Sequence, residues 1–125
     1  MDSGGRESAI TLELADPATI VQVRGQLDLG TAQRFRSVLT QAVHGERCVV
    51  VDLSECSFID SVSIGLLLVA RREATGLGEC RAPMAIVAGG AVARTLELVG
   101  VGADPAAVPV HATVGDALDA VGSSG

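Results

Sequence analysis

Hydrophobic and polar side chains alternate near the start of the chain, which is typical of strands. Residues 10–14 place Ile, Leu and Leu at every second position, and residues 20–23 carry a second apolar group after Asp16-Pro17. A period of two indicates a strand with one buried face, and Asp-Pro favours a turn. The pattern therefore predicts two strands paired as a hairpin, the second of which ends at Gly25.

A different pattern follows in the middle of the chain. Residues 48–53 form a nearly continuous apolar run, which indicates a strand buried on both faces of an α/β sheet. We expect a loop over residues 54–59. Shorter apolar runs at residues 84–87 and 108–110 predict two further strands.

Four segments carry apolar side chains at helical spacing. The predicted helices run from about Thr31 to His44, from about Asp60 to Thr75, from Val92 to Val99 and from Val114 to Val121. Thr31 or Asp28 is suited to cap the first helix, Asp60 the second and Thr113 the fourth. Glycines at positions 45, 76, 78 and 100 are suited to end the first three. The order β-β-α-β-α-β-α-β-α predicts a layered α/β fold with one mixed β-sheet of about four to five strands and about four helices.

The bulk composition narrows the class of protein. The chain has 125 residues, which suits a single domain that we place at 8–121, with flexible ends at 1–7 and 122–125. Its net charge is −6, its nine basic residues are all Arg, and it lacks Trp and Tyr. Such a chain is poorly suited to nucleic acid, which needs basic patches and stacking platforms, and suits a protein partner. We expect no membrane association, because the longest apolar run (64–70) is too short to span a bilayer.

Cysteines and histidines give little support for a metal site. The three Cys have no CxxC spacing, and His44 and His111 lie far apart in the sequence. With no signal peptide apparent, we expect reduced thiols in a cytoplasmic protein and no metal or other cofactor.

Carboxylates follow two of the predicted strands, where sites form in open α/β sheets. Asp28 follows the second strand, and Asp52 and Asp60 flank the expected loop after the third. Asp60 also suits a purely structural role as a helix cap. The chain has neither a G-x-S-x-G elbow nor a G-x-G-x-x-G loop. We therefore expect a binding protein and not an enzyme.

The predicted helix after Asp60 has almost no polar face in its first half, because residues 62–70 are nearly all apolar. A helix that is apolar all round must be covered on every side. Two interpretations remain open: the protein's own sheet and helices cover it, or part of its start awaits a partner.

Five segments, in order, resemble the STAS domain family of anti-sigma factor antagonists. Residues 23–28 (V-R-G-Q-L-D) are similar to the family's V-x-G-x-L-D, residues 50–54 to V-x-D-L-S, and residues 58–61 (F-I-D-S) to its F-I-D-S or F-M-D-S. Residues 94–101 (R-T-L-E-L-V-G-V) resemble R-x-L-x-L-x-G followed by L or V, and residues 114–118 (V-G-D-A-L) fit the family's usual ending S-x-x-D-A-L or S-x-x-E-A-L. The resemblance covers roughly residues 8–121.

The resemblance implies a STAS-like layered fold and a small bacterial regulator of transcription. Relatives bind a serine-kinase anti-sigma factor of the GHKL ATPase type and so free a sigma factor. The kinase phosphorylates a serine in the family's D-S-S-G-L motif, which makes the relatives phosphoproteins. The partner surface implied here comprises Asp28, Asp60, Ser61, Val62, Ser63 and Ile64. We expect a monomer or a weak homodimer.

This chain departs from the family at the phosphorylated position. In ungapped register Val62 replaces the phosphorylated serine, and Ser63 replaces the glycine that follows it. Three interpretations remain: Ser61 or Ser63 is a displaced phosphorylation site, the protein is an antagonist without the usual switch, or the fold serves another partner. The alternative function is a ligand- or nucleotide-sensing module or another protein-interaction module.

Overall fold

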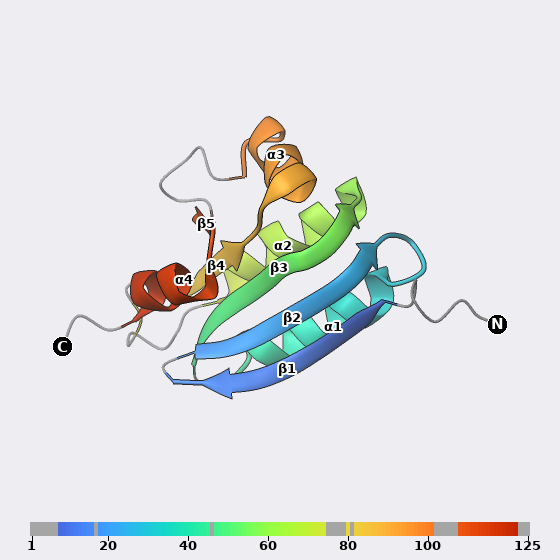
Figure 1. The fold of residues 1–125 in the computed structure, drawn as a ribbon. Coiled ribbons are helices and arrows are strands. Elements are labelled where there is room, and N and C mark those ends of the chain that lie inside the picture. The colour runs from blue at the N-terminus through green and yellow to red at the C-terminus, as the bar shows by residue number, and fades with distance from the viewer. Residues whose placement is uncertain are drawn as a thin grey trace.

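Five strands form one sheet in which the order in space is the order in the chain (Figure 1). The computed structural model describes residues 8–16, 18–45, 47–74, 80, 82–101 and 108–122. The first two strands are antiparallel and every later pair is parallel. This confirms the predicted hairpin and the mixed sheet. The strands are β1 (Ala9–Ala15), β2 (Ala18–Leu27), β3 (Cys48–Ile59), β4 (Met84–Val87) and β5 (Val110–His111).

Four helices in the described residues cover the sheet on both faces. They are α1 (Ala32–Val43), α2 (Ser61–Glu73), α3 (Gly90–Leu98) and α4 (Val114–Val121). In Figure 1, α1 and α2 lie behind the sheet and α4 lies on its opposite side. The α/β fold class and the number of elements are as predicted.

The central strand β3 explains how the two faces are filled. Val49 and Val51 belong to the apolar cluster that includes side chains of α1, α2 and α3, whereas Val50 belongs to a smaller cluster that includes side chains of α4. Successive side chains of a strand point to opposite faces, so a strand covered on both faces must be apolar at every position. Burial of β3 on both faces explains the nearly continuous apolar run at residues 48–53 of the sequence.

The smaller cluster covers only the amino-terminal ends of β2 and β3. Ala18, Ile20, Cys48 and Val50 belong to it, whereas farther along Arg24 of β2 and Glu55 of β3 form an exposed ion pair (Nε to Oε1, 3.0 Å). The carboxyl ends of these two strands are therefore open to solvent on the α4 side.

The loop predicted at residues 54–59 is wrong, because β3 continues to Ile59. It remains paired with β2 as far as Leu27, across register shifts on either side of Gly25. Gly25 has a φ of 94°, a conformation that glycine adopts readily and other residues rarely do. The polar residues of this half of β3 point to the open face, while Cys56 and Ile59 point into the core.

Other boundaries differ in detail. The last strand lies at Val110–His111, slightly later than the predicted 108–110. The second helix ends at Glu73, slightly before the predicted Thr75. The glycines expected to end it (76 and 78) and the expected flexible ends (except Gly122) lie outside the described residues.

The helix caps follow the prediction in two of three helices. The Ser63 N–H donates to Asp60 Oδ1 (2.8 Å), and the Asp116 N–H donates to Thr113 Oγ1 (3.1 Å). Thr31 occupies the cap position of α1, but its side chain makes no cap bond to that helix. It is instead used within the preceding turn, where it donates to the Gln26 carbonyl and accepts from the Asp28 N–H (both 3.0 Å).

Candidate partner-binding site

The two acids predicted for the site lie together at the carboxyl edge of the sheet. Leu27 and Ile59 are paired residues of β2 and β3, and the Asp60 N–H donates to the Leu27 carbonyl (3.0 Å). Asp28 and Asp60 follow these paired residues directly. Strand pairing therefore brings together two residues that are far apart in the sequence.

Each carboxylate has a local structural role and remains partly exposed. Asp28 Oδ1 accepts from the Gly30 N–H (3.0 Å), which stabilises the turn before α1. Asp60 caps α2, where a negative charge also interacts favourably with the helix dipole. Both acids thus present negative charge at fixed positions beside the start of α2.

The first turn of α2 has an exposed and a buried side. Ser61 is exposed and the side chain of Val62 is 49% exposed, whereas Ser63 (0%) and Ile64 (7%) are buried against the sheet. The Ser63 hydroxyl has no hydrogen-bond partner in the described residues. Of the predicted contact residues, Asp28, Asp60, Ser61 and Val62 form surface, and a partner cannot reach Ser63 or Ile64 while α2 stays in place.

Apolar side chains continue along the exposed side of α2. Val62, Leu66 and Val69 follow helical spacing on one side of the helix, and Val69 is 47% exposed. Leu66 and Val69 also line a groove between α1 and α2, together with Arg36 of α1. Part of the all-apolar helix is therefore covered by the protein, and part faces solvent.

Two further apolar side chains beside the acids were missed in the sequence. Leu29 is 80% exposed in the turn after Asp28, and Phe58 is 49% exposed near the end of β3. Leu29 belongs to no periodic pattern, and Phe58 falls in the segment expected as a loop. One signal was available: Phe58 is one of only two aromatic residues in the chain.

The cysteines differ from the expectation of reduced thiols. Cys48 and Cys80 form a disulfide with a Cα–Cα distance of 5.9 Å, so that expectation is wrong for this pair. The parallel pairing of β3 with β4 brings the segment before Met84 beside the start of β3. Cys56 is a buried thiol under the site, and burial raises its pKa above the ordinary value. A buried neutral thiol is a weak nucleophile.

In the described residues, no group of three or more His, Cys, Asp or Glu side chains is arranged to hold a metal ion. The same part of the chain contains no helix that is long and apolar enough to cross a bilayer. His44 lies at the carboxyl end of α1, at the opposite end of that helix from Asp28.

The fold and this edge define a small α/β domain with acidic and exposed apolar side chains at the carboxyl ends of its strands. The STAS domain family model matches residues 9–117, and the chain belongs to that family.

The chain is similar in sequence to a curated protein and in structure to solved proteins. The chain is 36% identical over 56 residues to a STAS-domain containing protein of Pseudomonas aeruginosa, and this match spans about half (55%) of that relative's length. An anti-sigma factor antagonist of Mycobacterium paratuberculosis has a similar structure, with a TM-score of 0.81 and 26% identity over 93% of this chain and 95% of that one. Unphosphorylated SpoIIAA, also an anti-sigma factor antagonist, shares the fold, with a TM-score of 0.63 and 21% identity over 89% and 96% of the two chains.

Proposed function

We propose that this protein is an anti-sigma factor antagonist. In this proposal its single domain, residues 8–121, binds a serine-kinase anti-sigma factor of the GHKL ATPase type in the cytoplasm and so frees a sigma factor. Its similarity to the mycobacterial antagonist supports the class of partner. STAS proteins of this kind are typically regulators without catalytic activity, and nothing in the proposal requires a reaction by this chain.

One observation carries the proposal: exposed apolar side chains flank two fixed carboxylates. Leu29, Phe58 and Val62 expose large apolar surfaces beside Asp28 and Asp60. Apolar anchors supply much of the affinity of a protein interface, while charged groups around them set orientation and the choice of partner. The arrangement fits a partner surface with basic side chains around an apolar pocket.

The proposal includes the absence of the usual phosphorylation switch. Val62 stands where relatives carry the phosphorylated serine, and valine has no hydroxyl to accept phosphate. Of the two neighbouring serines, Ser63 is fully buried and Ser61 is exposed. Ser61 lies about 100° around the helix from Val62, so a kinase site fitted to position 62 would meet it poorly.

Substitution of each acid by asparagine tests the site. We expect Asp28→Asn and Asp60→Asn each to lower the affinity for the organism's GHKL-type anti-sigma factor about tenfold or more, because each removes a charge from the interface. Asparagine caps helices about as well as aspartate, so α2 should remain intact in Asp60→Asn. Isothermal titration calorimetry at physiological salt measures the change.

Asp119→Asn is the matched control, because Asp119 is exposed on α4 on the other side of the sheet. It should bind as the wild type does. If Asp28→Asn and Asp60→Asn fold normally and also bind with wild-type affinity, the partner contacts another surface.

A further inference from the structure

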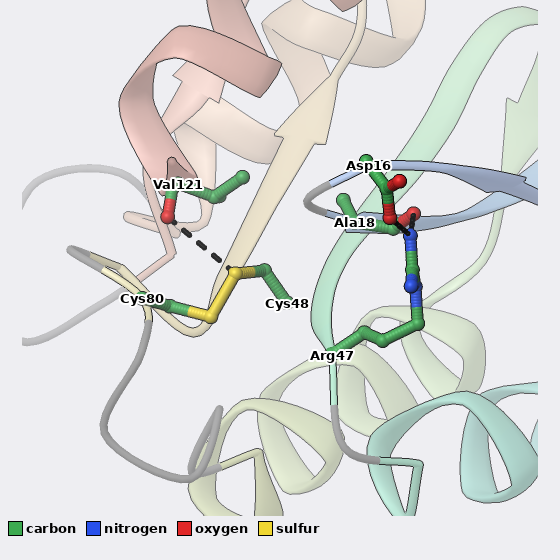
Figure 2. The surroundings of a disulfide bond; sticks show 6 residues. All are labelled: Asp16, Ala18, Arg47, Cys48, Cys80 and Val121. Atoms are coloured by element: carbon green, nitrogen blue, oxygen red, sulfur yellow. Dashed lines mark hydrogen bonds and ion pairs between the residues drawn. A yellow bond between two sulfur atoms is a disulfide. The ribbon is translucent and has the colours of Figure 1, made fainter. Parts of the chain in front are cut away.

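The disulfide lies at the end of the sheet opposite the candidate site. Cys48 is the first residue of the 12-residue strand β3, and Asp60 follows its last residue. At about 3.3 Å per residue the two ends of this strand are more than about 30 Å apart. Figure 2 shows Cys48 and Cys80 near the carboxyl end of α4, beside the amino end of the sheet.

The two sulfur-bearing residues differ in their access to solvent. Cys48 is 1% exposed and belongs to the apolar cluster that includes side chains of α4. Cys80, in the connection before β4, is only partly buried. In thiol–disulfide exchange the accessible sulfur is attacked or attacks first. A small thiol or disulfide from solution therefore meets Cys80 before Cys48.

We propose that this pair is a redox modification site in which Cys80 is the entry residue for low-molecular-weight thiols and disulfides, and Cys48 is the resolving residue. This inference rests on the cysteine geometry and is independent of the proposed partner. In the reducing cytoplasm of the proposed function, disulfides are usually transient and redox-sensing, and a reversible pair would agree with that location.

The Cys80 thiolate attacks a disulfide RSSR, the S–S bond of RSSR breaks, and one RS⁻ leaves as the mixed disulfide Cys80–S–S–R forms. The Cys48 thiolate then attacks the Cys80 sulfur and expels the second RS⁻. The two protons lost by the cysteines end on the two RS⁻ groups. In sum, two protein thiols are oxidised to one disulfide, and RSSR is reduced to two RSH; excess RSH reverses the sequence.

The fold offers the Cys48 thiol a hydrogen-bond acceptor when the disulfide is reduced. Cys48 Sγ lies 3.5 Å from the carbonyl oxygen of Val121, the last residue of α4 (Figure 2). A reduced Cys48 can donate its S–H to this oxygen, which is among the last carbonyls of the helix and has no partner within it. Reduction therefore leaves no buried donor without an acceptor.

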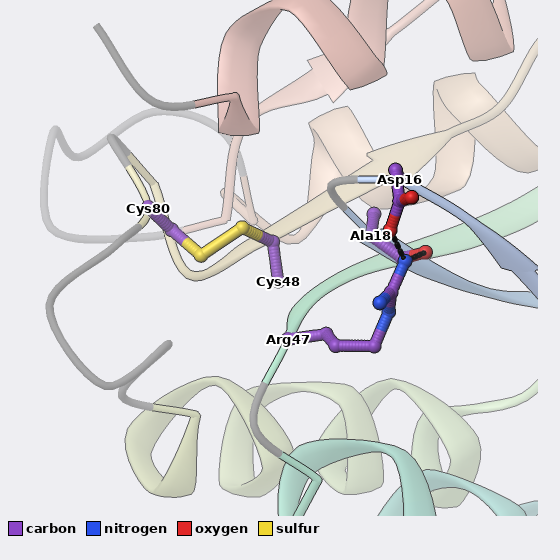
Figure 3. Close-up of polar contacts among 5 residues, drawn as sticks. All are labelled: Asp16, Ala18, Arg47, Cys48 and Cys80. Carbon is purple, nitrogen blue, oxygen red and sulfur yellow. Dashed lines mark hydrogen bonds and ion pairs between the residues drawn. A yellow bond between two sulfur atoms is a disulfide. The ribbon is translucent and has the colours of Figure 1, made fainter. Parts of the chain in front are cut away.

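A separate contact holds the start of β3 without the disulfide. The Arg47 guanidinium donates to the Asp16 carboxylate and, at 3.3 Å, to the Ala18 carbonyl (Figure 3). Asp16 lies in the turn between β1 and β2, and Ala18 is the first residue of β2. Cys48 should therefore stay in place when the disulfide opens, which favours rapid closure of the ring after Cys80 is modified.

The remaining thiol does not compete for the disulfide. Cys56 lies farther along β3, about 26 Å from Cys48 at the usual rise of a strand, and its side chain is buried. The pair Cys48–Cys80 should thus form without scrambling. Closing it links residues 32 positions apart and encloses β3 and α2 in one covalent ring.

Exposure of the reduced protein to glutathione disulfide tests the order of the two cysteines, with intact mass and peptide mapping as the readout. Wild type should lose two hydrogens and keep no stable adduct. Cys48→Ala should keep one glutathione, mapped to Cys80. Cys80→Ser should gain little adduct while folded, and Cys56→Ser should behave as the wild type does.

The same samples report the effect on stability. Because the ring constrains the unfolded chain, the oxidised wild type should melt about 10 °C above the reduced wild type, and Cys48→Ala should melt equally in both conditions. If a variant fails to fold, a wild-type time course quenched with iodoacetamide still shows which cysteine carries the transient adduct. Adduct on Cys48 before Cys80, or no disulfide in oxidised wild type, would overturn the proposal.

Discussion

Replacement of Phe35 by alanine should lower the free energy of unfolding by about 3–5 kcal/mol. Phe35 is fully buried where α1 packs on the sheet, and it is the one aromatic side chain in the described core. Its removal leaves a cavity among aliphatic side chains, and a domain of this size has a total stability of only about 5–15 kcal/mol. Urea unfolding followed by far-ultraviolet circular dichroism measures the loss, since the chain has no Trp or Tyr for fluorescence.

Phe58→Ala is the matched control for this substitution. Phe58 is the other phenylalanine, and about half of its side chain is already exposed at the candidate site. Its replacement should cost only about 1 kcal/mol, because only about half of the side chain is buried. Equal losses in the two variants would contradict the assignment of Phe35 to the core and Phe58 to the surface.

Val62→Ser should create a phosphorylation site if the partner is a serine kinase of the proposed type. The substitution places a hydroxyl at an exposed position in the first turn of α2, the position that the proposed function assigns to the family's phosphorylated serine. A phosphate there adds about −1.5 to −2 charges beside Asp28 and Asp60. We expect stoichiometric phosphate by intact mass after incubation with the kinase and ATP, and an affinity at least about a hundredfold lower afterwards.

Val69→Ser controls for exposure and residue type on the same helix. Val69 is as exposed as Val62 but lies two turns further on, and it should accept no phosphate. If Val62→Ser binds the kinase and remains unphosphorylated, the partner does not use this position as its substrate. Equal modification of both variants would show that the kinase is not selective for position 62.

Periodicity predicted most of the fold, and the exceptions have local causes. The hairpin, the central strand and the four helices carry clear apolar patterns, so their order was evident. The second half of β3 was missed because its outward residues, such as Ser54 and Ser57, are polar and its bulged pairing with β2 breaks the simple alternation. The disulfide depends on the register between β3 and β4, which no local pattern contains.

The sequence predicts the charged residues of the candidate site, but it does not predict which neighbouring side chains are exposed. Asp28 and Asp60 each follow a strand, and the parallel pairing of β2 with β3 places them together. The exposure of Leu29 and the burial of Ser63 depend on how the turn and α2 are oriented over the sheet. That orientation is set by packing contacts such as Leu67 in the core, which sequence spacing does not specify.

Calorimetric titration of the wild-type protein with its GHKL-type anti-sigma factor, before and after incubation with ATP, tests both the proposed partner and the absence of the phosphorylation switch. We expect binding in both titrations, with the same affinity and an unchanged mass. Absence of binding without ATP would contradict the proposed partner. Loss of affinity after ATP, together with phosphate on Ser61 or Ser63, would contradict the absence of the switch.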